Sequence, residues 1–167
     1  MTRYLLDSNV FIQAKNLHYR FEFCQAFWDL LIELNNQGKV FSISKVKKEL
    51  ERGNDSLTDW IINLPDNFWL DENTHIAEYA DVINWSSGQN FTQKAMEDFA
   101  EYSRADAWLV STAKAMTDTV IVTQEAHIDP NIKKAIKIPN VANAFGIDCL
   151  SVYDFLSATC ENNFTAK

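Results

Sequence analysis

Glycine and proline are scarce in this sequence, which holds 4 glycines and 3 prolines among 167 residues. That is about 4% of the chain, where roughly 12% is average. Because tight turns are built mainly from these two residues, few such turns are available. The scarcity excludes a many-turned sandwich or barrel and favours long helices with short connections.

Cysteine is also rare, and Cys24, Cys149 and Cys160 are odd in number and widely spaced. They form neither a disulfide framework nor a zinc motif, so a reducing compartment is expected. We interpret each as a small buried apolar residue.

No apolar run approaches the ~20 residues of a membrane span. The first residues, MTRYLLDSNVFI, reach Asp7 after only three apolar residues, which is not typical of a signal peptide. These features predict a soluble cytoplasmic protein with no membrane partner.

Basic residues are outnumbered, since 15 Lys and Arg face 23 Asp and Glu, a net charge of −8. This balance excludes a uniformly basic nucleic-acid-binding domain. It leaves room for a nuclease whose carboxylates hold a metal ion. The length and the 47% apolar content predict one domain over residues 1–167 with one sizeable core.

Short apolar runs alternate with helical patterns along the chain. Buried strands are predicted at 4–6, 40–44, 119–123 and 147–150. Helices are predicted at 21–37, 45–52, from a capping box at Ser56–Asp59 to Leu64, at 75–86, at 92–116 and at 153–160. Strands separated by helices predict βαβ units and a mainly parallel α/β sheet.

Two acidic residues follow predicted strands, Asp7 after 4–6 and Glu125 after 119–123. In open α/β sheets, ligands bind beyond the carboxyl ends of the strands, so both acids lie where a site would form. The alternative for each residue alone is a helix N-cap or a loop acid.

Two further acids lie within predicted helices. Asp106 falls on the core-facing stripe of 92–116, where an unpaired charge is costly and Arg104 lies off that face. Glu49 shares an edge with Val46 and Leu50. The alternatives are a buried ion pair for Asp106 and an exposed position for Glu49.

Together the four acids predict a metal site. At ~4 Å and an effective dielectric constant near 20, two carboxylates repel by roughly 4 kcal/mol, so convergence requires protonation or a cation. Oxygen ligands favour Mg²⁺ or Mn²⁺ over zinc. His18, His75 and His127 are scattered and are interpreted as surface residues.

Four segments resemble, in order and spacing, the acidic motifs of PIN-domain ribonucleases. They are Leu5–Ile12, Val46–Leu50, Ala105–Leu109 and Val122–Glu125. A C-terminal segment, Lys137–Ile147, is similar to a VapC-like toxin subgroup. Glu125 stands where Asp is usual, and His127 where many members carry a further acid, which makes Asp129 a reserve candidate for the fourth position.

The resemblance implies a three-layer α/β/α sandwich and a Mg²⁺- or Mn²⁺-dependent endoribonuclease, with Asp7, Glu49, Asp106 and Glu125 as catalytic metal ligands. It also implies the toxin of a toxin–antitoxin pair, a cognate antitoxin and a homodimer. Ser8 and Asn9 could contact the metal's water or the scissile phosphate, or satisfy the turn after the first strand.

RNA contacts are expected from two basic clusters, Lys45, Lys47, Lys48 and Arg52, and Lys133, Lys134 and Lys137. Trp85 and Phe91 could stack bases if exposed, with core packing as the alternative. Two other readings stay open. One is a PIN-like RNA- or protein-binding module with weak or no catalysis. The other is a Mg²⁺-dependent phosphate-handling α/β protein, although Asn9 stands where a phosphatase needs a second Asp.

Overall fold

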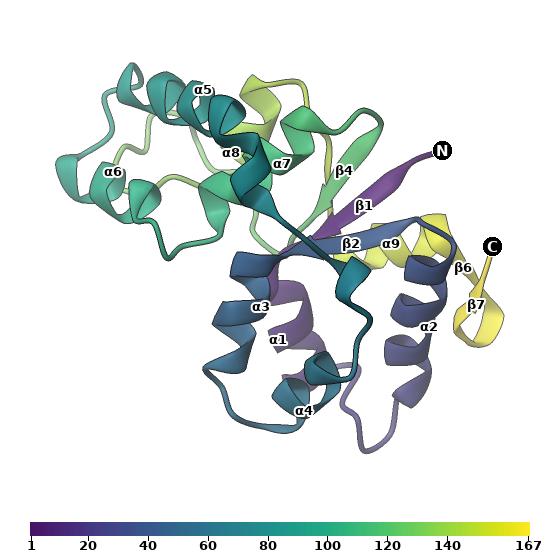
Figure 1. Cartoon of the computed structure of the whole chain (residues 1–167). Coiled ribbons are helices and arrows are strands. Elements are labelled where there is room, and N and C mark those ends of the chain that lie inside the picture. The colour runs from purple at the N-terminus through teal and green to yellow at the C-terminus, as the bar shows by residue number, and fades with distance from the viewer.

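The computed structural model describes residues 1–167, and five parallel strands form its central sheet in the order β3-β2-β1-β4-β5. Figure 1 shows the sheet running through the middle of the molecule. The strands are β1 (Arg3–Leu6), β2 (Val40–Ile43), β3 (Trp69–Leu70), β4 (Thr119–Val122) and β5 (Cys149–Leu150). The predicted three-layer α/β/α sandwich with a parallel sheet is therefore confirmed.

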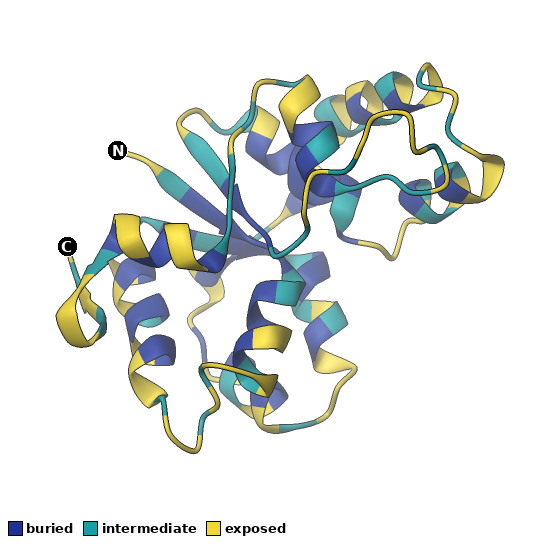
Figure 2. Ribbon diagram, turned by 180° about the vertical axis from the view of Figure 1, so that it is seen from behind, coloured by how far each residue is buried: buried dark blue, intermediate teal, exposed yellow.

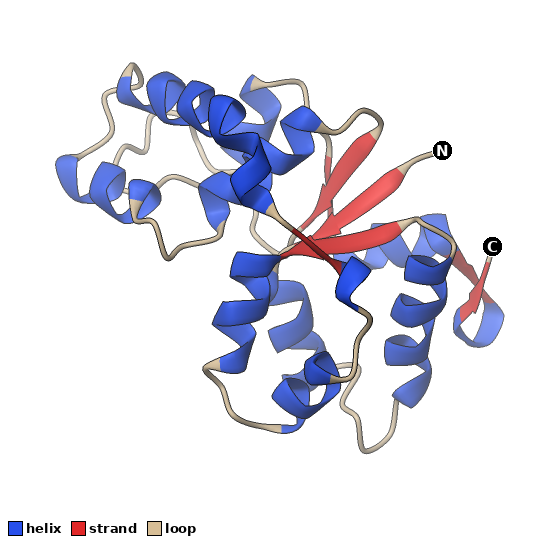
Figure 3. Ribbon diagram, in the orientation of Figure 1, coloured by secondary structure: helices blue, strands red, loops and turns tan.

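Helices cover both faces of this sheet (Figure 3). One layer holds α5 (Ile76–Ser87), α6 (Gln93–Ala100), α7 (Asp106–Ala115) and α8 (Ile138–Ala144). The other holds α1 (Ser8–Asn16), α2 (Gln25–Asn36), α3 (Ser44–Glu51), α4 (Ser56–Ile62) and α9 (Val152–Thr159). Single-turn 3₁₀ helices lie at Asp66–Phe68, Glu72–His75 and Asn162–Phe164, and the last joins the C-terminal hairpin β6 (Cys160–Glu161) and β7 (Thr165–Ala166).

The core is a single cluster of 36 buried apolar residues. β1 and β4 are apolar because they pair along their whole length at the centre of the sheet, where helices cover both faces. Figure 2 shows this central region as buried, with exposed residues on the outer helix faces and loops. The three cysteines are free and half-buried, so none is disulfide-bonded.

The prediction of one long helix over 92–116 is wrong, because two helices occupy this segment. The chain leaves α6 at Glu101, whose backbone is extended, and α7 begins only at Asp106. Tyr102, expected on the core-facing stripe, is 65% exposed. The apolar periodicity continues across the break because Phe99, before it, and Ala105, after it, are both buried.

Two other predicted boundaries shift. The helix predicted from residue 21 begins at Gln25, although it ends as expected before Gly38, whose φ of +73° suits glycine after a helix. The capping box begins one residue earlier than predicted, because the Asp55 side chain accepts from the Thr58 amide and the Thr58 hydroxyl accepts from the Asp55 amide.

No helix in the structure combines the length and the apolar composition that crossing a membrane requires.

Candidate active site

The strand order reverses between β1 and β4, which makes this position the switch point of the sheet. From β1 the chain builds outward through β2 and β3, and β4 and β5 then add to the other side. The helices that follow two such neighbouring strands leave on opposite faces, which opens a crevice at the strands' carboxyl ends. Asp7 follows β1 directly, and Thr123, Gln124 and Glu125 follow β4 at this point.

Asp7 is buried in the crevice, with only 3% of its surface exposed. It caps α1, since one carboxylate oxygen accepts a hydrogen bond from the Ser8 amide at 2.7 Å. The other accepts from the Thr123 hydroxyl at 2.9 Å. Burial, together with the charges of Asp106 and Glu125, raises the pKa of Asp7 to about 7, against the opposing effect of these hydrogen bonds.

Thr123 and Asn9 clamp the two strand ends together. The side-chain nitrogen of Asn9 donates to the Thr123 hydroxyl oxygen at 3.3 Å. The side-chain oxygen of Asn9 accepts from the backbone amide of Gln124 at 3.0 Å. The Thr123 hydroxyl oxygen also accepts from the Glu125 amide. Asn9 lies in the first turn of α1 and bonds the chain after β4, whereas its predicted structural role was to satisfy a turn after the first strand. Thr123 was not predicted as a site residue, although it lies within the fourth motif.

Asp106 is the first residue of α7 and forms no ion pair or side-chain hydrogen bond. Burial, with the charges of Glu125 and Glu49, raises its pKa to about 6, although Arg104 and Lys137 oppose the shift. It belongs to the site, but not for the predicted reason, because it begins a helix and does not interrupt a core stripe.

Glu49 and Glu125 are half-buried and each anchors a neighbouring element. Glu49, on α3, accepts a hydrogen bond from the buried Ala105 amide at 3.0 Å. Glu125 accepts from the Ile138 amide, the first of α8, at 2.8 Å. Each carboxylate therefore uses one oxygen for the fold and leaves the other without a protein partner.

Glu49, Asp106 and Glu125 line one pocket of about 350 Å³. Asp7 is not part of its lining but lies close enough to Asp106 and Glu125 for their charges to act on it. The same lining contains three cationic side chains, from Arg104, Lys134 and Lys137. We call this the acidic pocket; its mixed charge suits a phosphate group near a cation.

Other predicted candidates lie outside this pocket. Asp129 is exposed, and its side chain accepts from the Asn131 amide in a local turn. His127 is exposed and lines a different cavity. The Ser8 hydroxyl donates a hydrogen bond to the Asp7 carboxylate at 3.4 Å.

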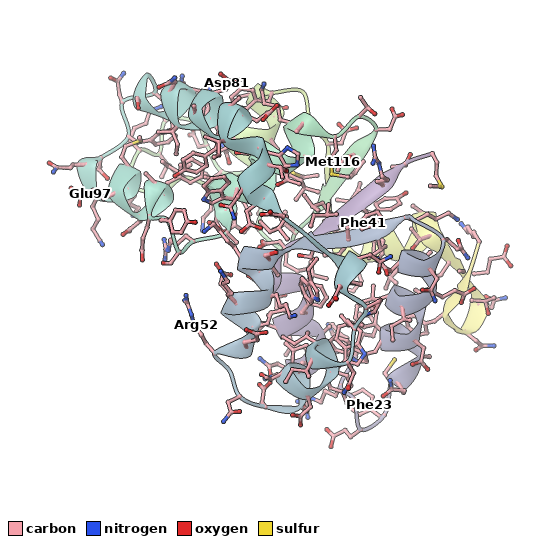
Figure 4. All side chains as sticks on the ribbon, in the orientation of Figure 1. Phe23, Phe41, Arg52, Asp81, Glu97 and Met116 are labelled. Carbon is pink, nitrogen blue, oxygen red and sulfur yellow. The ribbon has the colours of Figure 1, made fainter.

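The two predicted basic clusters differ in their placement. Lys45 is 3% exposed, with its ammonium 3.4 Å from the centre of the Tyr102 ring, so it is not available to bind phosphate. Arg52 extends from the far end of α3 into solvent (Figure 4). The second cluster lies at the site, because Lys134 and Lys137 line the acidic pocket.

The carboxylates suit a hard divalent cation in chemistry, but they do not form a ready-made cage. No group of three or more His, Cys, Asp or Glu side chains is arranged to hold a metal ion. Mg²⁺ commonly keeps several waters and binds through one or two carboxylates, so it does not require such a cage. The pKa values of Asp7 and Asp106 are raised first by burial and then by the neighbouring carboxylates, which Arg104 and Lys137 offset only in part at Asp106.

Residues 4–162 match the family model described as a domain of unknown function, DUF4411. The chain belongs to the DUF4411 family. No curated protein and no solved structure matches it. The DUF4411 match begins within β1 and covers the other four strands of the sheet, so Asp7, Glu49, Asp106 and Glu125 all lie within the family's domain.

Proposed function

We propose that this protein is a Mg²⁺- or Mn²⁺-dependent endoribonuclease of the PIN type. The observation that carries the proposal is the convergence of four carboxylates at the switch point of the sheet, two of them with raised pKa values, beside three cationic side chains. The order of the acidic motifs along the chain supports the same assignment.

The cation would be held by Asp7 and Asp106, with Glu49 and Glu125 completing its surroundings directly or through water. Bound there, it would supply activation of water and stabilisation of the charge that develops on a phosphodiester. Lys134, Lys137 and Arg104 also line the acidic pocket and would bind the phosphate oxygens. Thr123 and Asn9 position Asp7.

The biological role that follows from the resemblance is a cytoplasmic toxin, neutralised by a cognate antitoxin and acting as a homodimer. These partners are part of the proposal. The sequence resemblance supports them, through the segment Lys137–Ile147.

The decisive experiment compares Asp7→Asn with Asp59→Asn, which removes an exposed carboxylate from α4. We expect the wild type to cleave single-stranded RNA with Mg²⁺ or Mn²⁺ and to be inactive in excess chelator. Asp7→Asn should fold and bind RNA but not cleave it, whereas Asp59→Asn should cleave like the wild type. Undiminished cleavage in chelator would overturn the metal-dependent mechanism, and equal cleavage by the two variants would overturn the site.

A further inference from the structure

A second cavity of about 170 Å³ adjoins the acidic pocket. Its walls come from α5, from the turn that follows α5, from the segment between β4 and α8, and from α8 itself. Ala135 and Lys137 line both cavities, so the two share a wall. The proposed function assigns no role to this second cavity.

Aromatic rings form one side of the cavity. The Trp85 and Phe91 ring centres lie 6.2 Å apart with their planes at 60°, and both residues are half-buried. Ile128, Ile132 and Ala144 add aliphatic surface. The Lys133 ammonium lies 5.3 Å from the centre of the Phe91 ring, which brings a positive charge to the aromatic wall.

The cavity also presents polar groups without partners. The side chains of Gln89, Asn143 and His127 line it and form no hydrogen bond within the protein. Asn140 differs, because its amide donates to the Ile128 carbonyl at 2.8 Å and its oxygen accepts from the Ile128 amide at 3.0 Å. Asn140 therefore fixes the wall, and the other three are free to bind a ligand.

We propose that this cavity binds one unpaired nucleobase of the RNA strand whose phosphate lies in the acidic pocket. The proposal rests on the proposed function, because the shared wall at Lys137 is what places a base beside the reacting phosphate. Aromatic and aliphatic walls with free amides suit a base, since bases offer both a ring face for stacking and an edge for hydrogen bonds.

The size and charge of the cavity favour a base over other occupants. A cavity of about 150 Å³ holds a benzene ring, so this one admits a single ring system and not a base pair. Lys133 and Lys137, on its lining, supply positive charge for the phosphates of a bound strand. We call it the base cavity.

The test measures binding in excess chelator, where cleavage is not expected. The probes are fluorescein-labelled RNA hexamers of A, C, G or U, and a hexamer of the same sugar-phosphate backbone without bases. The variants are Phe91→Leu, which keeps apolar volume but removes the ring, and Asn143→Ala. Their matched controls are Phe23→Leu and Asn84→Ala, exposed residues outside the base cavity.

We expect Phe91→Leu to weaken binding of the preferred hexamer about tenfold, the scale of one lost stacking contact. Asn143→Ala should reduce the difference in affinity among the four hexamers. Neither variant should change binding of the abasic strand, and neither control should change anything. Melting temperatures close to the wild type's would show that the variants are folded.

Equal weakening of the hexamers and the abasic strand would overturn the base cavity, as would wild-type affinities that do not depend on the base. A cleavage assay separates this failure from that of the ribonuclease. If RNA is cleaved but binding is independent of the base, only the base cavity fails. If binding depends on the base but no metal-dependent cleavage occurs, the ribonuclease proposal is overturned and the proposal that the cavity binds a base is supported.

Discussion

At the scale of single residues, the site depends on carboxylates that also serve the fold. Asp7 caps α1, Glu49 holds the start of α7, and Glu125 holds the start of α8. The pKa of Asp7 is raised first by burial and then by the negative charges of Asp106 and Glu125. Fold and site therefore cannot be varied independently here.

Thr123 gives a direct test of how Asp7 is positioned. Thr123→Val keeps the shape but removes a hydroxyl that bonds Asp7, Asn9 and Glu125, which should cost ~1–3 kcal/mol of stability. Loss of this donor also raises the pKa of Asp7 further. We expect a ~10–100-fold drop in cleavage and a pH–rate profile moved to higher pH.

Thr123→Ser is the matched control, because it keeps the hydroxyl and should retain most activity and the wild-type pH profile. If the valine and serine variants have the same profile, Thr123 is a packing residue and does not position Asp7.

The titration of Asp7 and Asp106 predicts how metal-free stability depends on pH. Their pKa values in the folded protein, about 7 and about 6, lie above the ordinary value of 3.8. Between pH 4 and 7 the folded state therefore binds more protons than the unfolded state, so stability falls as the pH rises through this window. In chelator, the melting temperature should be higher at pH 5.5 than at pH 8.

The change with pH should be smaller in Asp7→Asn, which has lost the group with the larger shift. A metal-free wild type that melts higher at pH 8 than at pH 5.5 would contradict the raised pKa values.

At the scale of elements, the sequence was sufficient where apolar runs are short and fully buried. The strands β1, β2 and β4 match their predictions within a residue at each end. It was insufficient for α1, α8 and the two-residue β3, which no prediction included. α1 starts in the residues that were assigned to a turn after Asp7, and β3 is too short to show a period.

The candidate site divides in the same way. The sequence indicated Asp7 and Glu125 because they follow strands, whereas Asp106 was selected from a continuous helical stripe that the structure breaks before it. Thr123, Arg104 and the cavity beside the site follow from contacts between distant segments. The break between α6 and α7 was hidden, because both sides of it bury apolar residues.

Glu49 connects two elements across the crevice, which separates its structural role from its chemical one. Glu49→Gln keeps an oxygen that accepts from the Ala105 amide, so its melting temperature should equal that of the wild type. Glu49→Ala leaves that buried amide unpaired, which should cost ~1–3 kcal/mol of stability. Both should lose cleavage. Thermal melts and cleavage assays measure the two effects, with the exposed Glu51→Ala on α3 as control. Equal stability of the Gln and Ala variants would show that this hydrogen bond does not hold α7.

At the scale of the molecule, the four carboxylates form one cluster of negative charge at the carboxyl ends of the strands, between the two helical layers. The chain carries a net charge of −8, so distant charges add no compensation on average. Three positive groups, Arg104, Lys134 and Lys137, line the same pocket as Glu49, Asp106 and Glu125. A bound cation would therefore change the stability of the whole fold as well as its chemistry.

Asp106→Asn tests this coupling, because Asp106 is the one acid of the four without a hydrogen bond or ion pair to lose. The change keeps the shape and removes one charge facing Glu125, Glu49 and Asp7, a relief of ~1–3 kcal/mol after screening. In chelator the variant should melt several degrees above the wild type, at roughly 2–4 °C per kcal/mol. Millimolar Mg²⁺ or Mn²⁺ should reverse the order of the two melting temperatures, so that the wild type melts above Asp106→Asn.

At a hundredfold excess of metal over Kd, the wild type gains about 2.7 kcal/mol of stability and the variant gains less. The variant should also lose cleavage. If Asp106→Asn melts well below the wild type in chelator, Asp106 is a structural charge and the carboxylates do not form a cation site.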